Sequence, residues 1–355
     1  MRACAVRAAR DIALVELEPV ERLGPREVRI AYATGGICGS DLHYYFEGGV
    51  GNFRLREPLI LGHEVVGTVT EIGDEVTAVA VGQGVAVDPN LPCLACRECL
   101  SGATNLCREM TFFGSAAVMP HVQGGWREEL VVPERQAVGL PEGTDLSIAA
   151  FAEPLAICLH AVSRAGPVAH REVLVTGCGP IGCLAIAALR LAGAARVIAA
   201  DVAGGVLGHA RELGADETID LSTDPERMTE LQEARGRVDA ALECSGAPRA
   251  LAACIEAVRP HGTIVQTGML PRGDNPIPAN RIVAKELALT GTFRFHDEFR
   301  IAVDALVSGR IDPVSLLTGT FDFADVDAAF EAARDRTRHM KVQLRFDAAR
   351  TARAA

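Results

Sequence analysis

Four cysteines lie close together between residues 93 and 107, at a spacing that could hold a metal ion. They form the pattern C-x2-C-x2-C-x7-C in a loop rich in turn residues, DPNLPCLACRECLSGATNLC. This spacing lets four thiolates converge tetrahedrally on zinc, and a closed four-thiolate shell leaves no position for a substrate. We therefore predict a structural zinc site, with an iron–sulfur cluster or unligated surface cysteines as the alternatives. The predicted ligands are Cys93, Cys96, Cys99 and Cys107.

A second group of possible ligands combines one sulfur, one nitrogen and one carboxylate. Cys38 lies in one segment, and His63 and Glu64 are adjacent in another. Three protein ligands leave a fourth position for water or an alcohol, which is the arrangement of catalytic zinc sites. Such residues are more often packed or hydrogen-bonded in a core than bound to metal. Their neighbours favour a site, because Ser40 and His43 follow Cys38 closely and glycines surround the pair in GHEVVGTVTEIGDEV.

Residues 177–182 read GCGPIG, the G-x-G-x-x-G pattern of a dinucleotide-binding turn. The apolar segment VLVT precedes it and an apolar helical segment follows, so that the helix N-terminus could bind a pyrophosphate. Asp201 ends the next predicted strand, where a carboxylate accepts a hydrogen bond from a ribose 2′-hydroxyl. Its charge would repel a 2′-phosphate, and residues 202–208 contain no Arg or Lys. NAD is therefore favoured, NADP is the alternative, and a tight turn without a cofactor is the remaining interpretation. The predicted cofactor residues are Gly177, Gly179, Pro180, Ile181, Gly182 and Asp201.

Two kinds of sequence pattern indicate the structural elements that position these residues. Up to about residue 148 the chain has short β-branched segments broken by Gly and Pro, which predict a β-rich domain. From about residue 150, apolar strands alternate with helical segments, which predicts a parallel, doubly wound sheet covered by helices. After residue 291, two helical segments and a last strand are expected to complete the first domain. We thus predict an α/β protein with a catalytic domain over 1–148 and 292–355 and a Rossmann domain over 149–291.

Composition restricts the range of partners. The 355 residues are 49% hydrophobic, enough for two packed cores, and carry a formal net charge of −11 without a Lys/Arg-rich run. Nucleic acid and anionic membranes are therefore unfavourable partners, and a small soluble substrate fits better. The segment 181–195 is the most apolar helix expected and is too short to span a bilayer. Eleven cysteines without an export signal indicate thiols and metal ligands in a reducing compartment, which predicts a cytoplasmic protein.

The chain resembles the zinc-containing medium-chain alcohol and polyol dehydrogenases over nearly its whole length. The likeness is carried by GGICGSDLH, GHEVVG, the cysteine loop and GCGPIG. It implies a GroES-like catalytic domain beside the Rossmann domain, two zinc ions per chain, and a catalytic zinc at Cys38, His63 and Glu64. Glu153 matches an acidic position of the polyol dehydrogenases, which implies that it binds zinc directly, through water, or in exchange with Glu64. The alternative for Glu153 is an acid that favours the start of a helix.

The resemblance also implies a mechanism. Zinc lowers the pKa of bound water from about 15.7 to about 7, and the same effect on an alcohol would let its carbon release hydride to nicotinamide. Ser40 would take the hydroxyl proton and His43 would pass it to solvent. Without the family likeness, both would be turn residues after a strand.

Within the family, the likeness is greatest to the branch that oxidises polyols and sugar acids, in residues 35–53, 112–125, 151–161 and 291–299. It implies reversible oxidation at the C5 hydroxyl of a sugar acid, with a neutral polyol such as sorbitol or xylitol as the alternative, in a homodimer or homotetramer. Arg294 would bind hydroxyls or carboxylate, unless it is a surface arginine. Tyr44, Phe112 and His121 are further pocket candidates that could equally be packing residues. A catalytically silent protein that binds NAD and zinc is the alternative outside the enzymes, and the complete set of site residues argues against it.

Overall fold

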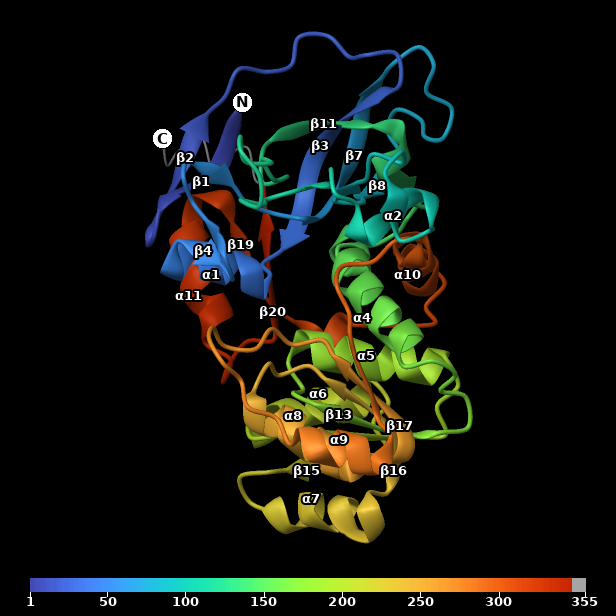
Figure 1. Ribbon diagram of the computed structural model, residues 1–355. Helices are drawn as coiled ribbons and strands as arrows, with labels where there is room; N and C mark the ends of the chain where they lie inside the picture. The colour runs from blue at the N-terminus through green and yellow to red at the C-terminus, as the bar shows by residue number, and fades with distance from the viewer. Residues whose placement is uncertain (347–355) are drawn as a thin grey trace. The chain divides into compact units, whose positions relative to one another are not determined.

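The computed structural model describes residues 1–346, which fall into two compact units (Figure 1). Of the described residues, unit 1 comprises Met1–Glu153, Phe299–Gly309 and 317–346, and unit 2 comprises Pro154–Glu298 and Arg310–Leu316. The domain limits predicted from the sequence stay a prediction, and residues 347–355 of the predicted catalytic domain lie outside the described residues.

Unit 1 is built on a seven-stranded sheet in the order β12-β8-β7-β3-β20-β19, with β11 paired to the first half of β3. All of its pairings are antiparallel except that of β19 with β20. The predicted β-rich character of the chain up to about residue 148 is confirmed by β3, β7, β8 and β11. The sheet strands are β3 (Glu27–Gly36), β7 (Glu64–Ile72), β8 (Gly84–Val87), β11 (Glu129–Pro133), β12 (Ala137–Gly139), β19 (Leu317–Asp322) and β20 (Lys341–Arg345).

Smaller elements surround this sheet. A three-stranded sheet has the order β2-β1-β6, and two strand pairs, β4 with β5 and β9 with β10, close loops. The remaining strands are β1 (Arg2–Ala8), β2 (Asp11–Glu16), β4 (Gly49–Val50), β5 (Phe53–Arg54), β6 (Leu59–Ile60), β9 (Asn90–Leu91) and β10 (Thr111–Phe112). The helices are α1 (Gly39–Glu47), α2 (Arg97–Leu100), α3 (Leu146–Ala149) and α11 (Val326–Arg334); α4 (Ala152–Arg164) and α10 (Glu298–Val307) contribute to both units.

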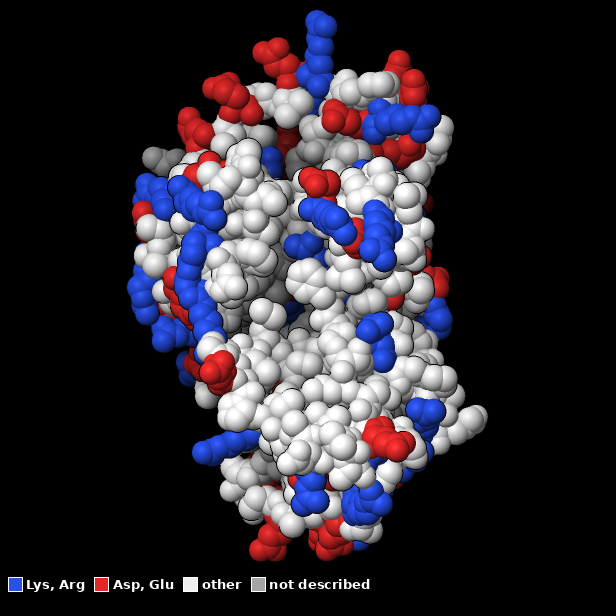
Figure 2. Space-filling model, in the orientation of Figure 1, with Lys and Arg blue, Asp and Glu red and all other residues white. Residues whose placement is uncertain are grey.

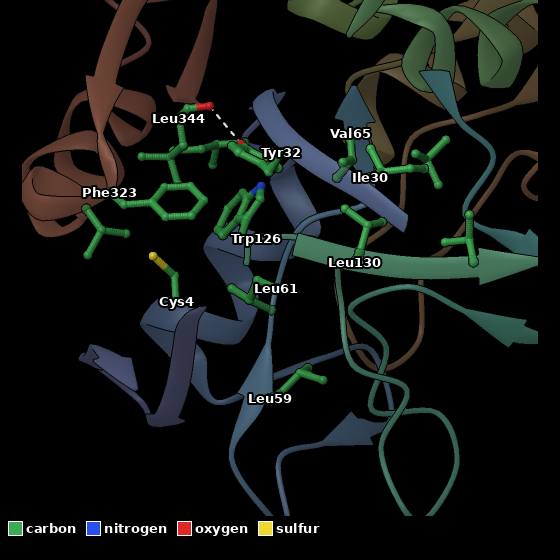
Figure 3. Close-up of a cluster of buried hydrophobic side chains, with 14 of the residues drawn as sticks. Cys4, Ile30, Tyr32, Leu59, Leu61, Val65, Trp126, Leu130, Phe323 and Leu344 are labelled. Carbon is green, nitrogen blue, oxygen red and sulfur yellow. Dashed lines mark hydrogen bonds between the residues drawn. The ribbon is translucent and has the colours of Figure 1, made fainter. Parts of the chain in front are cut away.

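The core of unit 1 joins segments that are far apart in the sequence. Trp126 and Phe323 are fully buried, and Tyr32 on β3 donates a hydrogen bond from its hydroxyl to the carbonyl of Leu344 on β20 at 2.7 Å (Figure 3). The last strand of the chain is therefore held against β3 both by backbone pairing and by this buried contact. The C-terminal segment thereby supplies part of the framework around the end of β3.

Unit 2 contains a six-stranded parallel sheet with the order β15-β14-β13-β16-β17-β18. Counted along the chain this is 3-2-1-4-5-6, the order of a doubly wound dinucleotide-binding sheet, so the predicted fold class is confirmed. The elements are β13 (Glu172–Thr176), α5 (Pro180–Leu191), β14 (Arg196–Asp201), α6 (Leu207–Glu212), β15 (Glu217–Asp220), α7 (Pro225–Gln232), β16 (Val238–Glu243), α8 (Pro248–Ala257), β17 (Val258–Gln266), α9 (Ala279–Lys285) and β18 (Ala288–Gly291). The sequence did not indicate the edge strands β15 and β18, which are short and lack a run of apolar residues.

One helical stretch of the described residues is long and apolar enough to cross a membrane, the 19 residues Leu146–Arg164 that include α3 and α4. The apolar helix expected at 181–195 is α5 (Pro180–Leu191), which is shorter than a membrane span. Of the most apolar window of Leu146–Arg164, 67% is buried inside the protein. The apolar character is thus accounted for by packing within this chain.

Candidate functional site

The four cysteines of the first predicted site converge. The Sγ atoms of Cys93, Cys96, Cys99 and Cys107 all lie within 4.8 Å of one another. The Cys93–Cys99 and Cys96–Cys107 Sγ distances are 4.0 and 3.9 Å, and tetrahedral ligation with Zn–S bonds of about 2.3 Å implies about 3.8 Å between sulfurs. The residues therefore fit one zinc ion.

Backbone N–H groups of this loop donate hydrogen bonds to cysteine sulfur atoms, which favours the thiolate form. The N–H groups of Ala95 and Cys96 donate to Cys93 Sγ at 3.4 and 3.3 Å, and they lower the pKa of Cys93 to about 7. The Cys93 N–H donates in the same way to Cys107 Sγ at 3.3 Å. Pairing of β9 with β10 closes the base of the loop, in the register Leu91↔Thr111. The loop thus favours the charged form of at least one sulfur.

The second group forms where β3 ends and β7 begins. Strand register pairs Gly36 with Glu64, so that Cys38, two residues after Gly36, comes close to His63 and Glu64. The ligand atoms of the three residues lie within 4.8 Å of one another. A Cβ atom on Gly36 would lie 1.8 Å from Glu64 Oε2, which explains why only glycine fits beside this carboxylate. The structure therefore brings together the three residues predicted from two separate segments.

Asp41 lies beside Cys38 and His63 and was not anticipated from the sequence. It is fully buried, and its Oδ2 accepts a hydrogen bond from the Cys38 N–H at 2.9 Å. Its Oδ1 lies 3.7 Å from His63 Nδ1, and neither atom has a hydrogen-bond partner. Metal-binding histidines commonly direct their second ring nitrogen toward a carboxylate. This pair of buried, unsatisfied atoms fits a His63 ring whose other nitrogen binds a cation.

Lys341 is the second residue that the sequence did not reveal. Its Nζ lies 2.7 and 2.8 Å from the two carboxylate oxygens of Glu64, and the two side chains are 4% and 1% exposed. Lys341 begins β20, which pairs with β3 next to Gly36, so the long-range register places it. A signal was present: Lys285 and Lys341 are the only lysines among 35 Lys and Arg residues. Both are buried, at 3% exposure.

The group as a whole attracts positive charge. Although burial lowers the pKa of His63, the charges of Asp41, Cys38 and Glu153 raise it well above its usual value. Burial also lowers the pKa of Lys341, but Glu64, Cys38 and Glu153 raise it overall. The negative charges of this group therefore stabilise cations at both positions.

Glu153 lies outside this ligand group, but charged residues of the group change its pKa. It opens α4, is 5% exposed and does not belong to the set of ligand atoms within 4.8 Å. Burial and the neighbouring Glu64 raise its pKa to about 7, against the opposing effects of His63 and Lys341. The structure therefore brings Cys38, His63 and Glu64 together, with Glu153 as an electrostatic neighbour.

The predicted proton relay lies on α1. Cys38 is the N-cap residue of this helix, Ser40 lies in its first turn, and His43 follows three positions later. Ser40 is partly exposed, and the His43 side chain is 53% exposed, with Nδ1 2.8 Å from Glu47 Oε1. Helical spacing of three puts both side chains on one face of α1, with His43 in contact with solvent.

The predicted substrate residues have different surroundings. The Phe112 ring lies 5.4 Å from the His63 ring, next to the candidate metal ligands. Tyr44 is buried in the core of unit 1, and its hydroxyl accepts a hydrogen bond from the Ala116 N–H. Both ring nitrogens of the buried His121 contact backbone groups of neighbouring loops. Arg294 lies in unit 2, with its guanidinium 4.9 Å from the centre of the Phe293 ring.

The glycine motif of unit 2 forms the turn between β13 and α5. Gly177 has φ +86°, and a Cβ on Gly182 would lie 1.8 Å from the Gly177 carbonyl oxygen. A Cβ on Gly179, the N-cap of α5, would meet nothing within 4 Å, which leaves space for a phosphate at this helix N-terminus. Asp201 ends β14, and its Oδ2 accepts the Cys178 N–H at 2.6 Å. The carboxylate is thus fixed against the turn, and the residues fit a dinucleotide.

Lys and Arg side chains lie interspersed with Asp and Glu over the face drawn in Figure 2. The chain as a whole carries a formal net charge of −11.

Two family models match separate parts of this chain, and known dehydrogenases resemble it over most of its length. The alcohol dehydrogenase GroES-like domain model matches residues 24–142, and the zinc-binding dehydrogenase model matches residues 180–308. An L-idonate 5-dehydrogenase (NAD(P)+) from Escherichia coli K12 is 41% identical over 89% of this chain and 91% of its own length. A sorbitol dehydrogenase from Arabidopsis thaliana is 34% identical over 91% and 89% of the two chains. The crystal structure of L-idonate 5-dehydrogenase from Escherichia coli K-12 superposes with a TM-score of 0.92, at 38% identity over 97% of this chain and 98% of that one.

Proposed function

The chain belongs to the zinc-containing medium-chain dehydrogenases, and we propose that it catalyses the reversible, NAD-linked oxidation of L-idonate at C5 to 5-keto-D-gluconate. The observation that carries this proposal is the convergence of Cys38, His63 and Glu64 in a chain that is 41% identical to an L-idonate 5-dehydrogenase. A sulfur, a nitrogen and a carboxylate make an open, three-ligand zinc site. A sorbitol dehydrogenase is also a relative, so a neutral polyol is the second candidate substrate.

We propose a task for each of the following site residues of unit 1. Cys38, His63 and Glu64 would hold one zinc ion, with Glu153 able to exchange with Glu64. When bound, that ion supplies Lewis acidity, which favours loss of a proton from a hydroxyl group. Ser40 accepts the proton by a hydrogen bond, and the exposed His43 passes it to water. Phe112, beside His63, would contact the apolar face of the sugar chain.

In unit 2, the N-terminus of α5 and the glycines of GCGPIG would bind the pyrophosphate of NAD, and Asp201 would accept a hydrogen bond from its ribose. When bound, NAD would supply a hydride acceptor. Arg294 is proposed as the cationic partner of the substrate carboxylate. We further propose that the protein is cytoplasmic and forms a homodimer or homotetramer. Light scattering of the purified protein would test the oligomeric state.

The choice of substrate is tested by reduction. Purified protein with NADH is expected to reduce 5-keto-D-gluconate with a kcat/KM at least about tenfold above that for fructose, because a carboxylate–arginine pair adds about 1.5–3 kcal/mol of binding. Faster reduction of fructose would reject idonate and support a polyol dehydrogenase. Absence of turnover with both substrates in zinc-loaded protein would favour the catalytically silent alternative.

Replacing Asp201 by serine is expected to relax the choice of cofactor. The loss of a charged hydrogen bond weakens NAD binding about tenfold or more, and removal of the negative charge lets a 2′-phosphate approach. The ratio of kcat/KM with NADP to that with NAD should therefore rise. Asp239→Ser, near the opposite end of the same sheet, serves as the control and should leave the ratio unchanged. An equal ratio in wild type and Asp201→Ser would contradict the assigned role.

Replacing Cys99 by alanine is expected to lower stability before activity. It removes one of four thiolates and opens the closed zinc shell, so the free energy of unfolding should fall by roughly 3–5 kcal/mol. Thermal unfolding and bound zinc measure the effect, with about two equivalents expected in wild type and one fewer in the variant. Unchanged stability together with two bound zinc ions would rule out a structural site.

A further inference from the structure

Unit 2 contains a third group of metal-ligating side chains that the proposed reaction does not use. His160 lies on α4, and His296 and Glu298 lie at the start of α10, more than 130 positions later in the sequence. The ligand atoms of the three residues lie within 4.8 Å of one another. No cysteine belongs to the group, in contrast to the two zinc sites of unit 1.

The Glu298 carboxylate lies between the two histidines. Its Oε1 is 2.9 Å from His160 Nδ1 and 3.9 Å from His296 Nε2, and its Oε2 accepts the His296 backbone N–H at 2.9 Å. The two imidazole rings meet edge to face, with their centres 4.9 Å apart and their planes at 76°. Asp297 Oδ2 lies 4.0 Å from His296 Nδ1, on the ring edge that faces away from Glu298. The group therefore has three possible ligand atoms close together, and the exposed Asp297 lies outside it.

Burial and charge suit a cation. His160 and Glu298 are 5% and 8% exposed, whereas the His296 side chain is 31% exposed and forms the side that solvent reaches. The buried Glu298 carboxylate contacts the His160 ring and the His296 backbone N–H, so that it lies between the two imidazole rings.

The distances are close to those of a tetrahedral site. Zn–N and Zn–O bonds of about 2.0–2.2 Å imply about 3.3–3.6 Å between ligand atoms. The observed 2.9 and 3.9 Å differ from that range by about 0.4 Å, which small side-chain rotations would remove. We propose that His160, His296 and Glu298 form a third, exchangeable site for a divalent transition metal such as Zn²⁺, Co²⁺ or Ni²⁺, with water at the remaining position. Imidazole and carboxylate ligands suit these ions.

The competing explanation is purely structural. In that case the His160–Glu298 hydrogen bond only fixes α4 to the start of α10, and His296 has no ligand role. The variant His296→Ala separates the two explanations, because it removes one proposed ligand and leaves the His160–Glu298 contact in place. His209→Ala is the matched control, since His209 is 28% exposed, lies in the same unit and sits 3.8 Å from the carboxylate of Glu212.

The experiment uses the protein with its resident zinc ions and Co²⁺ as the probe. Equilibrium dialysis should show one Co²⁺ bound beyond the resident metals, with absorption of a nitrogen- and oxygen-ligated ion and without sulfur-to-cobalt charge transfer. His296→Ala should bind this ion at least tenfold more weakly at an unchanged thermal midpoint, and His209→Ala should match the wild type. No additional Co²⁺, equal binding by His296→Ala, or charge-transfer bands from replacement at the cysteine sites would each overturn the proposal.

Discussion

Replacing Cys38 by alanine is expected to reduce kcat by about a thousandfold or more while NAD still binds. Cys38 is the only sulfur of the group at the ends of β3 and β7, and its loss leaves two ligands for the proposed zinc ion. Lewis acidity contributes several kcal/mol to a reaction of this kind, and each 1.36 kcal/mol corresponds to a factor of ten. Unit 2, which carries the glycine turn and Asp201, is unchanged by the substitution. Steady-state kinetics and NADH fluorescence measure the two properties separately.

Cys4→Ala is the matched control for this variant. Cys4 is a buried thiol of the same unit and belongs to none of the clusters of possible metal ligands. It should lose some stability and retain its turnover number, because its thiol only packs in the core. A Cys38→Ala variant with near-normal kcat, or with NAD binding lost in parallel, would contradict the assignment of separate tasks to the two units.

Replacing Lys341 by methionine is expected to lower the free energy of unfolding by about 3–5 kcal/mol. In the zinc-free protein, the substitution leaves the Glu64 carboxylate, 1% exposed, without a cationic partner, and an unpaired buried charge is strongly destabilising. Unfolding in urea, followed by fluorescence of the buried Trp126, measures the loss. The same variant should bind zinc at Cys38, His63 and Glu64 with a changed affinity, because the Glu64 carboxylate no longer contacts Lys341.

The double variant Lys341→Met/Glu64→Gln distinguishes a charge effect from a packing effect. With both charges removed, no uncompensated ion remains, and most of the lost stability should return. If the double variant is as unstable as Lys341→Met alone, the lysine acts through packing of its alkyl chain. A loss below about 1 kcal/mol in the single variant would mean that water reaches the pair, as at an exposed salt bridge.

The sequence alone determined the features that depend on neighbouring residues. Cys93, Cys96, Cys99 and Cys107 lie within 15 positions of one another, so a short loop is sufficient to bring them together. The turn GCGPIG is equally local, because the strand before it and the helix after it are both readable from their apolar residues. Alternation of strand and helix likewise predicted the parallel sheet of unit 2.

The edge strands and the contacts around the metal ligands were harder to predict from the sequence. Strands β15 and β18 lack the apolar pattern because they lie at or near sheet edges, where side chains meet solvent. Tyr44 was a pocket candidate on sequence position alone, and its burial in the core of unit 1 favours a packing role. The grouping of Cys38 with His63 and Glu64 was expected from family likeness, since no spacing rule links two segments 25 positions apart.

Only the tertiary structure decided what surrounds those ligands. Lys341 reaches Glu64 because β20, from the end of the chain, pairs with β3, and Gly36 leaves room for the carboxylate between them. His160 meets Glu298 although the two residues are more than 130 positions apart in the sequence. The physical reason is the same in each case. A sequence pattern reports the period and burial of one element, whereas strand register and helix packing are set by the free energy of the whole core.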